Sequence, residues 1–408
     1  MQKKLFVIIG ALLVVLTISL FLYVFFIQKA EDQLPTVQES SFPISSDSST
    51  ETPPAAFNGN DDAISDDISS SIEASAVATT TDKIPTDVFA PELRFTQLST
   101  KPVVGMSFTG TTTVRYSEQG TGALFELDLL TMETKMIATN LTGVISTTFN
   151  SNGSRVLMRI HDGLVLRFFA GVIAENARGE KELRGSFLPN NTVDATFTGV
   201  TNIRYLLATS NGGEIHTYEP STRADSIEAT IPFSQAYFAT SPQGTTYLIT
   251  KPSAHMNGTV YRYTPTGITA LIKSSLGLTA FAAGDYVYIT SYEQKKLRTL
   301  ATNGKMVQEV HNILNTDKCV ASPKTIYCAR PYEIPTQEYP DGWYRGEEQH
   351  NDILFTLNTQ TQRLVSTASP EVETGQIFDI LKLVAHPTRD DLLLLINKNN
   401  DSLWLFAR

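Results

Sequence analysis

The side chains best suited to contact a ligand lie in one long connection between two predicted strands. This connection covers residues 330–352 and is over twenty residues long, whereas hairpin loops usually have about 2–5 residues. Long ordered loops often carry function, and Tyr, Trp and Arg are enriched at binding hot spots. We therefore predict a ligand-binding surface formed by five residues of the loop: Tyr332, Tyr339, Trp343, Tyr344 and Arg345.

The sequence contains no motif typical of an enzyme or a metal site. There is no Gly-x-Ser-x-Gly elbow, phosphate loop or Gly-x-Gly-x-x-Gly, and no cysteine pair has the spacing of metal ligands. No two histidines have His-x-x-x-His spacing, and the six are His161, His216, His255, His311, His350 and His386. We therefore expect no metal, no cofactor and no catalysis, although distant loops can also assemble an active site.

The elements that must position these residues are short strands in a repeating unit. From about Pro91 onward, runs of Val, Ile, Leu, Tyr, Phe and Thr alternate with Gly, Asn, Asp, Pro and Ser, which is typical of an all-β protein. One strand-and-turn pattern recurs, for example at 124–128, 215–220 and 260–267. Its average interval is close to the ~40–50 residues of one four-stranded propeller blade.

A turn in the fourth unit resembles a known family of repeats. Ser241-Pro242-Gln243-Gly244 is similar to the Ser-Pro-Asp-Gly turn of WD40-like propeller repeats of the TolB type. No unit contains the Gly-His and Trp-Asp pairs of true WD40 repeats. The resemblance extends over most of residues 91–408 as an architecture, and it implies a fold without implying a function.

We predict that residues 91–408 form a seven-bladed β-propeller with four-stranded antiparallel blades. The last unit contains only three strands, and the segment Leu93–Leu98 could supply its missing outer strand, which would close the ring and remove exposed edges. Six or eight blades, or a β-sandwich, are the alternatives. The units divide approximately at 101–140, 141–189, 190–232, 233–274, 275–311, 312–370 and 371–408.

A propeller would place the 330–352 loop on a defined face. This loop joins the second and third strands of its blade, so it lies on the same face as the connections between blades, where ligands commonly bind. The alternative is a structural role, in which Trp343 and Tyr344 cap the central channel or pack on a neighbouring blade.

The N-terminus is expected to anchor the chain in a membrane. Residues 5–27 contain no charged side chain, and at 1.5 Å per residue they would form about 34 Å of helix, enough to cross the ~30 Å hydrocarbon core. A cleaved signal peptide is the alternative, but its apolar region should be shorter. Lys3 and Lys4 precede the segment, which predicts that residues 1–4 are cytoplasmic and the rest is extracytoplasmic.

An acidic linker follows the predicted membrane segment. Residues 28–90 are rich in Ser, Thr, Pro and acidic residues, which predicts a disordered stalk. This stalk accounts for nearly all of the net charge of −10, because residues 91–408 contain 28 basic and 30 acidic residues. A nearly neutral domain lacks the basic face of a nucleic-acid-binding protein.

The two cysteines, Cys319 and Cys328, are predicted to form a disulfide. If Pro323-Lys324 is a two-residue hairpin loop, the cysteines face each other across the hairpin with Cα atoms about 4.5 Å apart. That separation suits a disulfide, and an extracytoplasmic compartment permits one. The alternative is a pair of free thiols packed inside a blade.

These features favour a non-enzymatic function. We expect a membrane-anchored, extracytoplasmic binding or scaffold module for a protein or cell-envelope partner, or a sensory or structural subunit of an envelope complex. The alternative is a propeller-type hydrolase or lactonase with its site at the central channel.

Overall fold

A computed structural model of the chain describes residues 94–408 except 139–140, 242–243, 312, 359–360 and 362. Residues 1–4, the predicted membrane segment 5–27 and the predicted linker 28–90 lie outside the described residues. Within the described part of the chain, no helix is long and apolar enough to cross a membrane.

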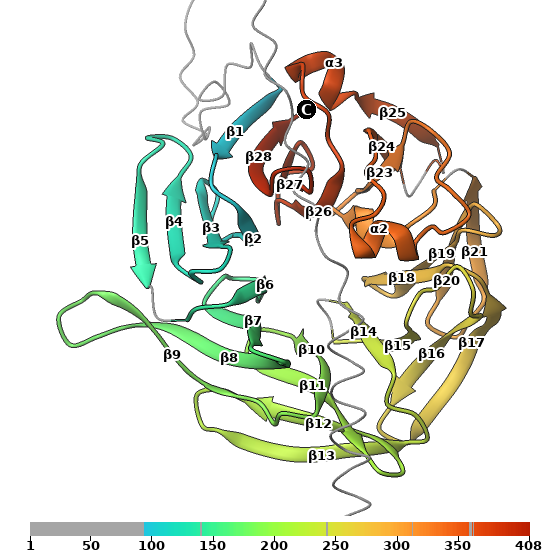
Figure 1. Cartoon of the computed structure of the whole chain (residues 1–408), viewed down its shortest axis with the longest axis horizontal. Coiled ribbons are helices and arrows are strands. Elements are labelled where there is room, and N and C mark those ends of the chain that lie inside the picture. Colours follow the sequence, from blue (N-terminus) through green and yellow to red (C-terminus); the bar gives the residue numbers. More distant parts are fainter. Residues whose placement is uncertain (1–93, 139–140, 242–243, 312, 359–360, 362) are drawn as a thin grey trace, which may run out of the picture. The chain divides into compact units, whose positions relative to one another are not determined.

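Seven four-stranded antiparallel sheets surround a central opening (Figure 1). Six of them use four consecutive strands each, and their order from the inner to the outer strand follows the sequence. Blades 1 to 3 are formed by β2 (Val103–Phe108), β3 (Thr113–Glu118), β4 (Leu124–Asp128), β5 (Thr134–Ala138); β6 (Val144–Phe149), β7 (Arg155–Asp162), β8 (Val165–Glu175), β9 (Lys181–Phe187); and β10 (Thr192–Thr198), β11 (Asn202–Thr209), β12 (Gly212–Glu219), β13 (Ala224–Ile231). Blades 4 to 6 are formed by β14 (Ala236–Thr240), β15 (Thr246–Thr250), β16 (Gly258–Thr264), β17 (Gly267–Ser275); β18 (Leu278–Ala283), β19 (Tyr286–Ser291), β20 (Lys296–Ala301), β21 (Met306–His311); and β22 (Cys319–Ala321), β23 (Thr325–Pro331), β24 (Asp352–Asn358), β25 (Leu364–Ala368).

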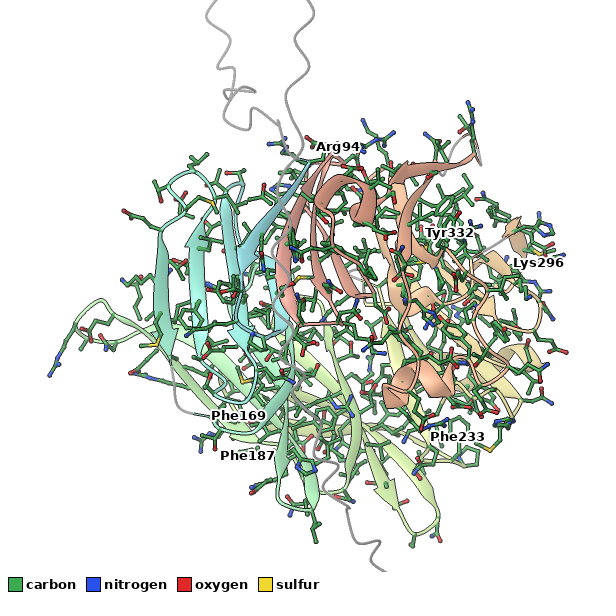
Figure 2. The ribbon with its side chains drawn as sticks, turned by 45° about the horizontal axis from the view of Figure 1, so that its top comes forward. Arg94, Phe169, Phe187, Phe233, Lys296 and Tyr332 are labelled. Carbon is green, nitrogen blue, oxygen red and sulfur yellow. A yellow bond between two sulfur atoms is a disulfide. The ribbon has the colours of Figure 1, made fainter. Side chains whose placement is uncertain are left out.

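The seventh blade joins the two ends of the described chain. It consists of β26 (Ile380–Ala385), β27 (Leu392–Asn397), β28 (Ser402–Ala407) and, as its outer strand, β1 (Phe95–Ser99). Phe95 is paired with Phe406 and their rings are 4.9 Å apart. Arg94 binds the carboxylate of Glu373 beside this strand (Figure 2). The predicted closing strand and the count of seven blades are therefore confirmed.

The apolar core lies between neighbouring sheets. One cluster joins blades 7 and 1 through Leu394 and Ile396 on one side and Met106 and Val114 on the other, all of them buried. The strands alternate inward and outward side chains, so each sheet can pack on a neighbour at both faces. Gly105 permits the close approach of β2 and β6, because a Cβ atom there would lie 2.2 Å from the carbonyl oxygen of Thr147.

The alternation of strand directions gives the propeller two different faces. We call the face with the connections between blades, and between the second and third strands of each blade, the loop face. The opposite face, with the other hairpin turns, is the turn face. Two short helices lie on the loop face: α2 (Asp341–Arg345), within the long connection of blade 6, and α3 (Pro370–Thr374), between blades 6 and 7. Figure 1 shows α2 at the edge of the central opening.

The cysteine prediction is confirmed as well. Cys319 and Cys328 form a disulfide, and they are directly opposite each other in the β22–β23 ladder. The hairpin register is the one expected from a two-residue loop, since Val320 pairs with Tyr327 and Ala321 with Ile326.

Candidate functional site

Buried charges hold the long loop of blade 6 in place. Lys318 ends a short 3-10 helix, η1 (Thr316–Lys318), and its Nζ atom lies 2.7 Å from Asp352 Oδ2 and 2.7 Å from Asp379 Oδ1. None of the three side chains has any exposed surface. Asp352 begins β24 directly after the loop, and Asp379 precedes β26 of the next blade. Together with Trp343, these residues form what we call the lysine network.

Trp343 connects the lysine network to α2. Its indole nitrogen donates to both carboxylate oxygens of Asp379 at 2.9 Å. Two ammonium groups lie over its ring, Lys318 at 4.7 Å and Lys398 at 4.5 Å from the centroid, which is a favourable cation–π geometry. Lys398 also donates to the Trp343 carbonyl, so both the side chain and the backbone of α2 are fixed.

Backbone amides also donate to the two aspartates of the lysine network. The amide of Ile380 donates to Asp352 Oδ2 at 2.7 Å, and the amide of His350 donates to Asp379 Oδ2 at 3.3 Å. Burial raises the pKa of Asp352, and Lys318 opposes this shift. Burial lowers the pKa of His350, and the neighbouring Lys318 lowers it further. The charge balance around the loop therefore depends on Lys318.

The structure divides the five predicted ligand-binding residues into two groups. Tyr339 and Trp343 are almost completely buried, as expected from the structural alternative. Tyr332 is 70% exposed (Figure 2), and Tyr344 and Arg345 are also exposed. The Tyr344 hydroxyl donates to the carboxylate of Asp317, and its ring packs edge-on against Trp343. A ligand-binding role for the five residues stays a prediction.

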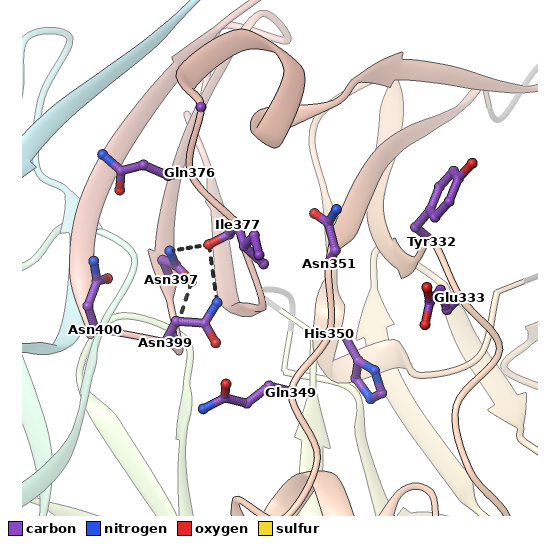
Figure 3. A pocket seen from close by; sticks show the side chains of 11 residues that line it. Tyr332, Glu333, Gln349, His350, Asn351, Gln376, Ile377, Asn397, Asn399 and Asn400 are labelled. Atoms are coloured by element: carbon purple, nitrogen blue, oxygen red, sulfur yellow. Dashed lines mark hydrogen bonds between the residues drawn. The ribbon is translucent and has the colours of Figure 1, made fainter. Parts of the chain in front are cut away.

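A groove of about 850 Å³ lies on the loop face between blades 6 and 7. Tyr332 lies on one side of it and Ile377 on the other (Figure 3). The amides of Asn397 and Asn399 donate to the Ile377 carbonyl at 3.0 and 3.1 Å. Several further amide side chains line the groove: Gln349, Asn351, Gln376 and Asn400. This lining offers many hydrogen-bond donors and acceptors with little net charge.

Sequence reasoning missed the lysine network and the amide lining. One signal was present, because Asp379 lies between Phe378 and Ile380 in an apolar run, where a charge needs a partner. The partner could not be identified, since Lys318 is 61 residues away from Asp379. The amides of the groove come from three separate segments and follow no spacing rule.

Other titratable groups lie on elements beside the central opening. Asp194 of β10 accepts from the amide of Phe238 at 2.7 Å, and burial raises its pKa to about 6. Asp317 of η1 has solvent-exposed surface, and desolvation by the surrounding protein raises the pKa of its carboxyl group too. Across residues 94–408 as described, no group of three His, Cys, Asp or Glu side chains could hold a metal ion.

Comparisons with known proteins show similarity in fold. No protein family model and no curated protein sequence matches the chain. Among solved structures, a chain of the Mitotic Checkpoint Complex has a TM-score of 0.51 with 10% identity, covering 84% of this chain and 99% of that chain. YCF48 bound to D1 peptide has a TM-score of 0.50 with 11% identity, covering 77% and 96%.

Virginiamycin B lyase from Staphylococcus aureus has a TM-score of 0.48 with 11% identity, covering 78% of this chain and 99% of that chain. At such low identity, similarity to a solved structure concerns the fold alone. The ring of seven four-stranded sheets, together with the similarity in fold to YCF48, establishes that the described domain is a seven-bladed β-propeller.

Proposed function

We propose that the protein is a single-pass membrane protein whose extracytoplasmic propeller binds a protein or cell-envelope partner without catalysing a reaction. The uncharged segment 5–27, with Lys3 and Lys4 before it, supports the membrane anchor and its orientation. The acidic segment 28–90 would be the tether between the membrane and the propeller.

The proposed binding surface is the loop face around the groove between blades 6 and 7. The main observation in favour of this surface is the lysine network. Apolar side chains often stabilise a protein as well as a buried ion pair does, so three buried charges are weak as a stabilising device. Their effect here is to fix the position of the 332–351 loop. A loop that is ordered before its partner arrives loses less entropy on binding.

The side chains around the groove suit a protein segment or a polar polymer. Tyr332 and Ile377 are exposed apolar groups on its two sides, and Ile334 and Val372 are exposed nearby in sequence. Apolar anchors beside hydrogen-bonding groups are the usual composition of a binding site. The amide lining would pair with uncharged polar groups such as peptide bonds.

Site-specific photo-crosslinking in intact cells tests this proposal. A photoreactive amino acid would replace Tyr332 in the full-length protein, or Leu130, which is exposed in a hairpin turn on the turn face. We expect a defined adduct from position 332 and none from position 130. The partner identified from the adduct should co-purify with a Leu130→Arg variant but not with Ile377→Arg. Equal adducts from both positions, or unchanged co-purification with Ile377→Arg, would contradict the proposed surface.

A propeller-type hydrolase or lactonase is the second candidate, favoured by the raised pKa values of Asp194 and Asp317. Acids with raised pKa values are suited to general acid–base catalysis. A panel of lactones and esters would be assayed with the wild type, with Asp194→Asn and Asp317→Asn, and with Asp285→Asn as the control. Hydrolysis that disappears only in the first two variants would support this candidate, and a wild type that hydrolyses none of the lactones and esters would contradict it.

A further inference from the structure

A second cavity lies at the turn-face end of the central opening, away from the groove. Its volume is about 590 Å³, within the usual range for a small-molecule site. Inner strands and first hairpin turns of several blades line it. Phe108, Phe149 and Val384 contribute apolar surface, and Ser107 and Ser151 contribute hydroxyl groups.

Lys382 of β26 is the one lining residue with a permanent charge near pH 7. Its Nζ atom donates to the carbonyl oxygen of Thr147 over 3.4 Å, which is a long hydrogen bond. No described carboxylate forms an ion pair with it, and burial lowers its pKa. Lys318 shows the contrast, because two aspartates neutralise that buried lysine.

The other titratable side chain of the cavity, His386, is already fully engaged. Its Nδ1 atom accepts from the amides of Thr388 and Arg389 at 3.2 and 3.1 Å, and its Nε2 atom lies 3.2 Å from the Thr111 carbonyl oxygen. His386 therefore serves to fold its own turn. Lys382 is left as a half-buried cation in a partly apolar cavity whose lining contains no anionic side chain, and withdrawing such a charge from water without a partner is costly.

We propose that this cavity binds a small organic monocarboxylate. The carboxylate would pair with the ammonium group of Lys382, and the apolar part of the ligand would contact Phe108, Phe149 and Val384. A single cationic side chain matches one negative charge, whereas a phosphate dianion would need more donors than the lining supplies. The site is independent of the proposed partner surface, because it lies on the opposite face.

Calorimetric titration of the full-length protein in a mild detergent tests the proposal, with hexanoate and its uncharged analogue hexanamide as probes. We expect hexanoate to bind at one site and hexanamide to bind at least about tenfold more weakly, because it lacks the charge-assisted hydrogen bond. Lys382→Met should weaken hexanoate binding about tenfold, whereas Lys382→Arg should retain most of it. Lys101→Met, which replaces a largely exposed lysine, is the matched control. Equal binding of the two probes, or full hexanoate binding by Lys382→Met, would overturn the proposal.

A second measurement needs no variant. Mass spectrometry would follow the acetylation of individual lysines in the wild-type protein with each probe. Hexanoate should slow the modification of Lys382 several-fold without affecting Lys101, and hexanamide should have no such effect. Unchanged acetylation of Lys382 in the presence of hexanoate would overturn the proposal even if the Lys382 variants did not fold.

Discussion

The indole nitrogen of Trp343 lies 2.9 Å from each carboxylate oxygen of Asp379, and this contact joins the loop helix of blade 6 to the first residues of blade 7. The same carboxylate accepts from Lys318 at 2.7 Å. One aspartate therefore receives hydrogen bonds from an element before blade 6 and from the loop inside it. The position of the long loop of blade 6 depends on this shared acceptor.

Trp343→Phe should destabilise the protein by about 1–3 kcal/mol, because it keeps most of the aromatic packing but removes a buried hydrogen-bond donor to a charged group. Trp343→Ala should cost more, about 3–5 kcal/mol. Denaturant unfolding of the full-length protein measures both. Tyr332→Phe is the control, since Tyr332 is largely exposed. A Trp343→Phe variant as stable as the wild type would show that the indole N–H is not needed.

Lys318→Met should cost about 3–5 kcal/mol, because it leaves Asp352 buried without a cation and leaves Asp379 with only the more distant ammonium group of Lys398, 3.9 Å away. Adding Asp352→Asn should recover part of the loss, since the second change removes the buried carboxylate charge that Lys318 alone had paired. Breaking the Lys101–Glu118 pair, whose lysine is largely exposed, by Lys101→Met should cost less than about 1 kcal/mol. Similar losses for Lys318→Met and Lys101→Met would contradict the account of the lysine network.

Much of the fold could be predicted from the sequence because its determinants are local. Turn residues and short apolar runs mark each strand, and a unit with three strands beside a spare segment at 93–98 indicated how the ring closes. The cysteine pairing followed from a two-residue hairpin loop. The predicted membrane anchor and linker lie outside the described residues, so they stay predictions.

The candidate site was harder to predict because its determinants are not local. Tyr332 and Trp343 look equally suited to binding by residue type, yet one is exposed and the other is buried. Trp343 is buried where its indole nitrogen donates to Asp379, and this aspartate lies next to the first strand of another blade. The groove also needs amides from both blades 6 and 7. The spacing of residues within one segment of the sequence could not indicate that these amide side chains converge.

Asp194 should make the protein less stable as the pH rises from about 4 to about 7. Burial raises its pKa from 3.8 to about 6, so in this range the folded state binds more protons than the unfolded state, and stability falls with rising pH. The full effect would be about 3 kcal/mol. Asp194→Asn should lack this component, whereas Asp285→Asn should keep it. Unfolding experiments at pH 4.5 and pH 7 measure the difference, and an equal effect of Asp194→Asn at both pH values would be incompatible with the raised pKa.

The Cys319–Cys328 disulfide should be present in the purified full-length protein. Alkylation in denaturant without reduction should leave the mass unchanged, and alkylation after reduction should add two groups. Replacing both cysteines with alanine should cost about 2–3 kcal/mol, because the closed loop is short. Two alkylated thiols without prior reduction would show that the bond does not form.

Hydrogen exchange of the full-length protein without a partner tests most directly whether the lysine network fixes the loop before binding. The amides of Tyr344 and Glu347 donate within the loop at 3.0 and 2.9 Å, and the amide of Asp352 donates to Phe378 at 2.7 Å. We predict strong protection of these amides in the wild type and at least about hundredfold faster exchange in Lys318→Met, in line with a loss of about 3–5 kcal/mol. Exchange at the rate of an unfolded chain in the wild type, or unchanged protection in Lys318→Met, would contradict the account.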